Sequence, residues 1–287
     1  MTATTQPVRA TARKPAISRK PRRSKKDVAG LLIIGVPLLL PFVPLLVWSF
    51  SATWFYPELV PTRFSLRSWE YLFSSASGVI PGFLTSLVIG LTVAFIAALI
   101  GLTSGRALGL HSFRGKGLVM FLVMAPVIVP PLTVAMGIEI VFIKLHLANT
   151  IPGVILVQLV PTIPYVTLVM SSVYANFDTA FEDQARVLGA SMLRTFWYVT
   201  LPAVFPGLVV AALFAFLLAW AEYIMTLLIG GGEVQTLPLI LFSFATSDLS
   251  IASALSIVFI VPAIVILFFS SRFLSGDRTS IGGFGRL

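Results

Sequence analysis

The chain has 287 residues, of which 57% are hydrophobic and only 11% charged. Soluble domains carry about 25% charged residues, so the composition excludes an ordinary soluble enzyme, a disordered chain and a fibrous protein. The absence of cysteine excludes disulfide scaffolds and thiolate metal sites. We therefore predict an all-α membrane protein with several spanning helices.

Residues 1–27 predict a disordered basic tail. Nine of the 20 Lys and Arg lie between Arg9 and Lys26, and no acidic residue precedes Asp27. A basic segment before an apolar stretch is typical of a cytoplasmic anchor that orients the first membrane helix, and we favour this over nucleic-acid binding. The apolar stretch that follows is of full membrane length, which disfavours a cleaved signal peptide.

Six apolar segments are long enough to span a bilayer, at about 20 residues per crossing. Residues 28–80 are then a first helix with an outer loop, 81–274 a helical core, and 275–287 a C-terminal tail. The six predicted transmembrane helices are 28–50, 81–104, 117–142, 151–174, 203–229 and 249–274.

The positive charges between these spans predict the orientation. Seventeen of the 20 Lys and Arg fall in the N-terminal tail, in the loops 105–116 and 175–202, and at the C-terminal end, against three elsewhere. Positive residues collect on the cytoplasmic side of membrane proteins. Both termini and these two loops are therefore expected in the cytoplasm, as an even number of crossings requires.

The outer loop 51–79 is rich in aromatic residues. We interpret them as a belt at the level of the lipid headgroups; contact with an external partner protein is the alternative. The residues are Trp54, Phe55, Tyr56, Trp69 and Tyr71.

Prolines inside the first, third and fourth spans predict broken helices, because each removes a backbone donor. The freed carbonyls need neighbours or a water-lined cavity, so we favour a bundle built around a pathway. The alternative is that proline is simply more frequent in membrane helices. Those of the third and fourth spans are Pro126, Pro130, Pro131, Pro161 and Pro164.

The sequence of the predicted cytoplasmic loop 176–202 indicates two short helices, unlike that of a simple connector between spans. Thr179-x-x-Glu182 has the form of a capping box and predicts the start of a helix. That helix is expected to end at Gly189, and a second short helix to follow before Pro202 closes the segment. The second helix would carry Met192, Phe196 and Val199 on one face. Two short helices meeting at a glycine suit docking into a groove on a soluble partner, or resting on lipid headgroups.

This loop resembles the EAA loop of ABC importer permeases. The family pattern is an acid, two alanines, three residues, Gly, nine residues, an aliphatic residue, one residue and Leu-Pro. The spacing from Asp183-Gln184-Ala185 through Gly189 to Val199-Thr200-Leu201-Pro202 matches it, with Asp, Gln and Val as departures at 183, 184 and 199. The resemblance covers about 81–274 and implies the six-helix type I importer fold.

The resemblance implies a permease subunit in a bacterial inner membrane that works with several partners. These are a second permease, two ATP-binding subunits and an extracytoplasmic solute-binding protein. The chain has no GxxxxGK[ST] phosphate loop, so ATP with magnesium is expected on the partner. We expect no catalytic, metal or nucleic-acid site here. The implied coupling residues are Glu182, Asp183, Gln184, Ala185, Gly189, Ala190, Leu201 and Pro202.

Two acids inside predicted spans, Glu139 and Glu222, are candidates for the solute pathway, because ionisable groups in hydrocarbon usually face a cavity or a partner. Glu139 is expected to share a helix face with His146. Alternatively, Glu222 pairs with the second permease and Glu139 is interfacial. The other polar or aromatic candidates for the pathway are Trp220, Tyr223, Gln158 and Tyr165.

Two acids on the route favour a cationic or amine-bearing solute. The segment around Glu222 resembles the polyamine importer branch, with Ala221 in place of the first acid of that branch's pair, and Trp220-x-Glu222-Tyr223 is also similar to a stretch of sugar permeases. Sugar, thiamine, iron and phosphonate importers are the alternatives. An ion-coupled secondary transporter would use Glu139 and Glu222 as coupling groups, but it leaves the loop 176–202 unexplained.

Overall fold

The structure is a computed structural model that describes residues 33, 35–54, 57–58 and 60–275. The chain divides into two units, Met1–Pro44 and Leu45–Leu287, and each is considered by itself. The predicted tail 1–27 and nearly all of 275–287 lie outside the described residues. So does the start of the first predicted span, whose described part is a shorter apolar helix, Gly35–Ser49, that includes α2 (Phe42–Ser49).

Among its described residues, the second unit contains four helices long and apolar enough to cross a membrane. They are α4 (Val79–Leu110), α7 (Ile151–Ala175), a continuous helix Met192–Trp220, and α13 (Leu249–Ser275). A bent helix pair supplies a possible fifth crossing. The all-α class is confirmed, while the count of six spans and the cytoplasmic position of the termini stay predictions.

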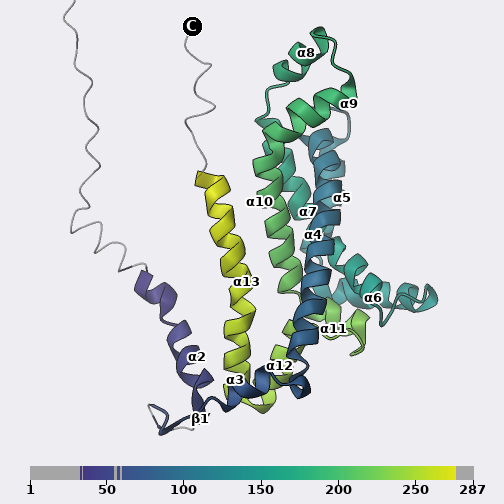
Figure 1. Cartoon of the computed structure of the whole chain (residues 1–287). Helices are drawn as coiled ribbons and strands as arrows, with labels where there is room; N and C mark the ends of the chain where they lie inside the picture. The colour runs from purple at the N-terminus through teal and green to yellow at the C-terminus, as the bar shows by residue number, and fades with distance from the viewer. Residues whose placement is uncertain (1–32, 34, 55–56, 59, 276–287) are drawn as a thin grey trace, which may run out of the picture. The chain divides into compact units, whose positions relative to one another are not determined.

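The α4 and α7 helices pack closely because glycines line their contact. Gly101, Gly105 and Gly109 recur every fourth residue of α4, so they fall on one face. A Cβ on Gly105 would overlap Met170 of α7, and a Cβ on Gly109 would lie 2.6 Å from the Ser171 carbonyl oxygen. Small residues let membrane helices approach at backbone distance, and this pair forms the centre of the bundle (Figure 1).

The third predicted span, 117–142, is not one straight helix. It consists of α5 (Lys116–Ile128) and α6 (Pro131–Lys144), bent by 97°. The break coincides with Pro130-Pro131, where two consecutive residues lack a backbone donor. Pro126 remains inside α5, and Pro161 and Pro164 remain inside α7. The expectation of broken helices is therefore right for the third span and wrong for the fourth.

The fifth predicted span, 203–229, is also interrupted. Helix α10 (Leu201–Trp220) ends before Ala221, and α11 (Ile224–Gly230) follows after a break of three residues. Gly231 and Gly232 then take positive φ values of 53° and 84°, which glycine adopts without steric cost. They turn the chain towards α12 (Leu237–Ser247), which the sequence reading had not identified.

The end of the bundle opposite α8 carries the segment before α4 (Figure 1). Strands β1 (Ser51–Thr53) and β2 (Arg63–Phe64) pair antiparallel, and α3 (Arg67–Leu72) and the 3-10 turn η1 (Ser75–Ser77) follow. Arg67 of α3 forms a 2.7 Å ion pair with Asp248. Asp248 also accepts hydrogen bonds from the first amides of α13, so it ties this segment to the last helix.

Candidate coupling site

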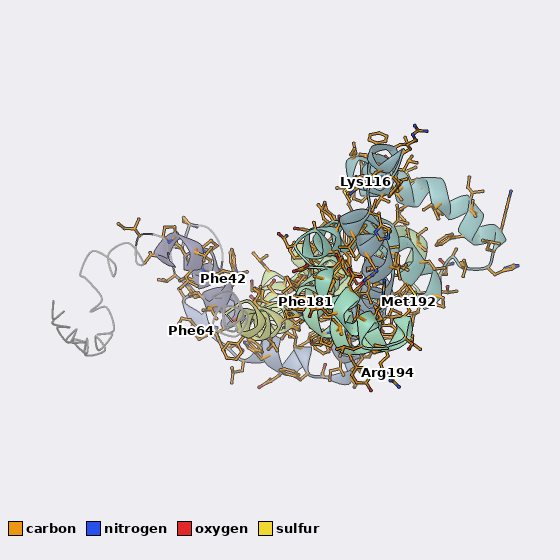
Figure 2. The ribbon with its side chains drawn as sticks, turned by 90° about the horizontal axis from the view of Figure 1, so that it is seen from above. Phe42, Phe64, Lys116, Phe181, Met192 and Arg194 are labelled. Carbon is orange, nitrogen blue, oxygen red and sulfur yellow. The ribbon has the colours of Figure 1, made fainter. Side chains whose placement is uncertain are left out.

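The loop 176–202 forms two short helices joined at a glycine, as predicted. Helix α8 (Ala180–Val187) and helix α9 (Met192–Thr195) lie on either side of Gly189, whose φ is 87°. This left-handed conformation is costly for residues with a Cβ. The loop stands at one end of the bundle, with Phe181, Met192 and Arg194 visible when that end is viewed from above (Figures 1 and 2).

The predicted capping box is wrong in its contacts although right about where the helix starts. Thr179 occupies the N-cap position of α8 without a side-chain hydrogen bond to the helix. Instead, Asp178 Oδ1 accepts from the Ala180 amide at 2.9 Å. The Glu182 side chain turns into the protein, because stronger partners than the N-cap amide lie there.

The second short helix does not end before the fifth span. After α9, a π-helical turn η2 (Phe196–Thr200) continues directly into α10. Pro202 follows directly after this π-helical turn, and its missing backbone donor does not interrupt the helix. The loop is therefore covalently continuous with α10 through an unbroken helix, and Pro202 does not close the segment as predicted.

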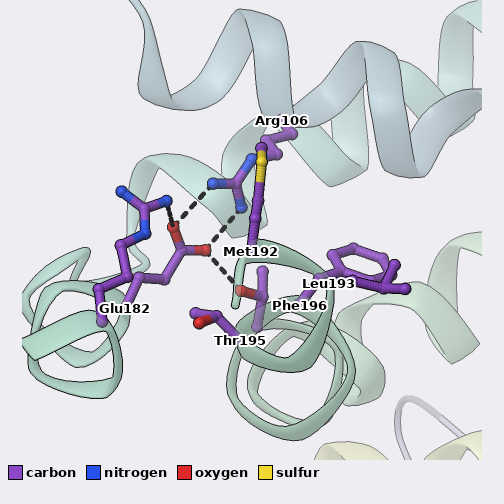
Figure 3. A pocket seen from close by; sticks show the side chains of 8 residues that line it. Arg106, Glu182, Met192, Leu193, Thr195 and Phe196 are labelled. Atoms are coloured by element: carbon purple, nitrogen blue, oxygen red, sulfur yellow. Dashed lines mark hydrogen bonds and ion pairs between the residues drawn. The ribbon is translucent and has the colours of Figure 1, made fainter. Parts of the chain in front are cut away.

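Glu182 is held by a buried cluster of hydrogen bonds (Figure 3). The residue is only 4% exposed. Arg106 of α4 donates to both its carboxylate oxygens, at 2.7 and 2.8 Å, and the Thr200 hydroxyl donates to Oε1. Arg186 lies one helical turn further along α8, with Nη2 3.7 Å from Oε2. The hydrogen bonds from Arg106 outweigh burial and lower the pKa of Glu182 to about 2.

Arg106 connects this cluster to the helix bundle. Its guanidinium lies 5.8 Å from the ring centroid of Tyr174 at the end of α7, within cation–π range. Arg106, Tyr174, Glu182 and Thr200 come from α4, α7, α8 and η2. Helix α8 is thus fixed to α4, to the end of α7 and to η2.

The outer surface of the loop is strongly apolar. Asp183, the acid of the EAA-like pattern, has a side chain that is 70% exposed; Gln184 and Gly189 are also exposed, and Ala185 and Ala190 are partly exposed. Large apolar side chains stand beside them. Val187, Leu188, Met192, Leu193 and Tyr198 are 69–88% exposed, and we call these five residues the apolar face.

A cavity of about 380 Å³ lies beneath the apolar face, between the two short helices and α4. Thr195 Oγ1 is buried without a hydrogen-bond partner. The described part of the chain contains no group of three His, Asp or Glu that could hold a metal ion. The residues that line this cavity are Arg106, Glu182, Arg186, Met192, Leu193, Thr195, Phe196 and Thr200.

Sequence reasoning missed Arg106 and Thr200 as parts of this site. Arg106 counted only as one positive charge among 17 that set the orientation. The spacing of Gly101, Gly105 and Gly109 was a usable signal for close contact of α4 with another helix, but it does not identify the partner. No pattern in the sequence pairs Arg106 with an acid 76 residues away.

Glu222, the main candidate for the solute pathway, lies in the break between α10 and α11. Its carboxylate accepts from the backbone amides of Met225 and Thr226 at 2.9 and 3.0 Å, and the Thr226 hydroxyl is 3.1 Å away. Gln158 Nε2 donates to that hydroxyl at 2.9 Å. Both carboxylate oxygens are therefore engaged by the first turn of α11.

The other pathway candidates are dispersed. Trp220 is 2% exposed, and its indole N–H donates to the Phe259 carbonyl. Tyr223 stacks on Phe242 at 4.6 Å between ring centroids, and both line a cavity of about 510 Å³. Trp220 thus has no free ring face or N–H for a ligand here, whereas Tyr223 borders open space.

Glu139 and Tyr165 are both partly exposed, on α6 and α7. The expected shared helix face of Glu139 and His146 is wrong, because α6 ends at Lys144 and His146 has a φ of 56°. The structure brings Glu222 and Gln158 into one network and does not add Glu139 to it.

A bundle of long apolar helices defines a class of protein, the multi-span membrane proteins. Residues 97–279 match the family described as binding-protein-dependent transport system inner membrane component, and the chain belongs to that family. It is therefore a permease subunit of an ABC importer, located in the inner membrane.

Relatives of this chain are named for different substrates. A putrescine transport system permease protein of Escherichia coli is 29% identical over 55% of this chain and 59% of its own length. The arabinooligosaccharides transport system permease protein of Halalkalibacterium halodurans is 25% identical over 91% of this chain and 98% of its own. The matched segment thus spans little more than half of the putrescine permease.

The solved structures show the same fold at low sequence identity. A bacterial ABC transporter that imports the acidic polysaccharide alginate aligns at a TM-score of 0.62 and 18% identity, covering 88% of this chain and 99% of the other. A chain of the methionine transporter MetNI aligns at a TM-score of 0.54 and 16% identity, over 68% and 94%. These likenesses confirm the importer permease fold.

Proposed function

We propose that this chain forms half of the solute pathway of an ATP-driven importer and couples to a separate ATP-binding subunit through the apolar face. The observation that carries the proposal is the exposure of five large apolar side chains on a loop that is held by the ion pair of Arg106 with the buried Glu182 carboxylate. Exposed apolar surface of this kind is typical of a protein-binding site. A rigid base loses little conformational entropy when the partner binds.

The partners of the assembly are a second permease, two ATP-binding subunits and an extracytoplasmic solute-binding protein. An alginate transporter that aligns with this chain was solved with a periplasmic protein bound, which supports the last of these. This chain binds no cofactor itself, and ATP with magnesium binds to the partner. The broken crossings α5–α6 and α10–α11 are the places where the pathway changes shape, because their backbones are already interrupted.

Introducing a charged residue on the apolar face tests the docking proposal. Leu188 is 88% exposed, so Leu188→Asp changes no internal packing. The variant should reach the membrane in normal amounts and lose the ATP-binding subunit that copurifies with the wild type. Leu66→Asp is the matched control, since Leu66 is 58% exposed in the segment at the opposite end of the bundle. Equal copurification of both variants would refute the docking proposal.

The solute class that we propose is a small cationic or amine compound such as a polyamine. Two polyamine permeases support this choice, with 29% and 24% identity. The Glu222 carboxylate supplies negative charge near the cavity that Tyr223 lines. Sugar is the second candidate, favoured by the arabinooligosaccharide relative, which aligns over 91% of this chain, and by the stacked pair Tyr223–Phe242.

A melting assay on the solute-binding protein of the system distinguishes between these solute classes. Putrescine, spermidine, arabinooligosaccharides, thiamine, phosphonates and iron complexes are each added to it, and its melting temperature is measured. A shift with the amines alone supports the polyamine assignment, and a shift with the oligosaccharides alone overturns it.

A further inference from the structure

We propose that Arg106 and Glu182 form a fixed strut through which the loop 176–202 moves as one body with α4 and α7. Arg106 is then a positioning residue for coupling, although it does not contact the partner. The inference rests on the proposed docking of the loop. It goes beyond that docking because it says which helices follow the loop when the partner moves it.

The chain itself connects the loop to only two of the long helices. Its N-terminal end leaves α7 at Ala175, and its C-terminal end runs through α9 and η2 into α10. Helix α4 is far away in the sequence and reaches the loop through the side chain of Arg106. Without the Arg106–Glu182 contact, the first loop helix, α8, would have no polar bond to α4 among the described residues.

The geometry of the Arg106–Glu182 contact resists displacement. Two parallel hydrogen bonds of 2.7 and 2.8 Å hold the guanidinium and carboxylate planes together. Such bidentate charged pairs are the strong and directional ones. Glu182 is 4% exposed, so separating the pair would leave a buried carboxylate without its main partner, which is costly. The loop cannot tilt away from α4 without breaking this contact.

Helix α4 transmits the displacement to α7, because the two helices pack at backbone distance. Arg106 follows directly after Gly105, one of the three glycines at which α4 approaches the α7 backbone. Its guanidinium also lies over the Tyr174 ring of α7. A displacement of Glu182 therefore reaches both helices at the ends next to the loop. The Thr200 hydroxyl attaches the same carboxylate to η2 by one further bond.

The strut is tested by distance measurements that require no knowledge of the solute. The chain has no cysteine, so Ala107→Cys and Ala180→Cys place two spin labels on exposed alanines of α4 and α8. Distances between the labels are measured in the assembled transporter without nucleotide and after trapping with ATP and vanadate. We expect one narrow distribution whose centre is the same in both states. A wild-type distance that changes with nucleotide would overturn the proposal.

Variants of the pair separate a strut from a passive contact. Arg106→Met should broaden the distance distribution and make its centre depend on nucleotide. Arg106→Lys keeps the charge without the bidentate geometry and should fall between the two. The exchange Arg106→Glu with Glu182→Arg should restore a narrow distribution. Arg114→Met, which removes an exposed charge just beyond α4, is the matched control and should change nothing.

The outcomes for docking and for the strut are distinct. Leu188→Asp abolishes copurification if the apolar face binds the partner, whereas the Arg106 variants should still copurify. An unchanged narrow distribution in Arg106→Met refutes the strut and leaves docking intact. If Arg106→Met fails to assemble, the wild-type comparison between nucleotide states and the Arg106→Lys variant still decide the question.

Discussion

Glu182 and Asp183 are neighbouring acids with opposite surroundings. The EAA-like spacing assigns the motif acid to Asp183, whose side chain is 70% exposed. Glu182 is buried and paired with Arg106. The sequence predicted that both matter, but it could not separate a contact with a partner from an internal one. That distinction depends on the rotation of α8 about its axis, which is set by the tertiary contact with α4.

Low pH should weaken the contact between Glu182 and Arg106, because the lowered pKa of Glu182 reflects a contact that favours the ionised carboxylate. A carboxylate whose pKa falls from 4.5 to about 2 on folding stabilises the fold above pH 4.5, and this stabilisation is lost as the pH falls towards 2. A shift of that size corresponds to about 3 kcal/mol. The width of the Ala107–Ala180 distance distribution should be constant from neutral pH to pH 4.5 and increase as the pH falls from there towards 2, where the folded protein takes up the proton. Broadening between pH 7 and 5 would contradict this.

Glu222 should behave as a helix cap as well as a pathway charge. Its carboxylate accepts from two amides of the first turn of α11, and removing such a cap costs about 1 kcal/mol. Glu222→Ala should therefore lower the melting temperature of the detergent-solubilised transporter, and Thr226→Val, which removes a neutral hydroxyl bonded to both Glu222 and Gln158, should lower it less.

A charge-removing variant, Glu222→Gln, compared with Thr226→Val separates capping from solute binding. If Glu222 attracts a cationic solute, Glu222→Gln should weaken putrescine uptake more than Thr226→Val does, because only the first removes charge. Equal uptake by Glu222→Gln and the wild type would remove Glu222 from the pathway and leave the cap as its role.

At the scale of helices, hydrophobicity predicted which segments form long apolar helices but not where those helices break. Four of the predicted spans correspond to long helices or to a bent pair, and the fifth ends at Trp220 rather than at residue 229. Proline alone was a poor guide, because Pro161 and Pro164 lie within the continuous helix α7. In the third span, the consecutive Pro130-Pro131 coincides with the 97° bend, since there two donors are missing in a row.

The glycine contact between α4 and α7 gives a prediction at this scale. Gly105→Ala places a methyl group against Met170 and 2.8 Å from its backbone carbonyl carbon, and overpacking of this kind costs about 1–3 kcal/mol. The melting temperature of the purified transporter should fall. Gly117→Ala is the control, because a Cβ there meets no atom within 4 Å and alanine favours the helix. Equal melting temperatures for the two variants would show that the α4–α7 contact accommodates an added methyl group, which would contradict the prediction.

At the scale of the whole chain, the class of protein was readable from the sequence because three independent signals agree. Apolar length and charge asymmetry indicate a multi-span membrane protein, the loop spacing resembles that of importer permeases, and family membership over residues 97–279 confirms this class. The solute was not readable in the same way. The candidate residues are engaged in the protein's own contacts, as Glu222 and Trp220 are, so their chemistry does not by itself name a ligand.

The central claim is that the apolar face binds an ATP-binding subunit, and photo-crosslinking in intact membranes tests it most directly. A photoreactive amino acid replaces Leu188, which is 88% exposed, and another chain carries it at Leu66 as the control. The account predicts a covalent adduct from position 188 with a protein that contains a GxxxxGK[ST] phosphate loop, and none from position 66. Adducts of position 188 with lipid alone would contradict it.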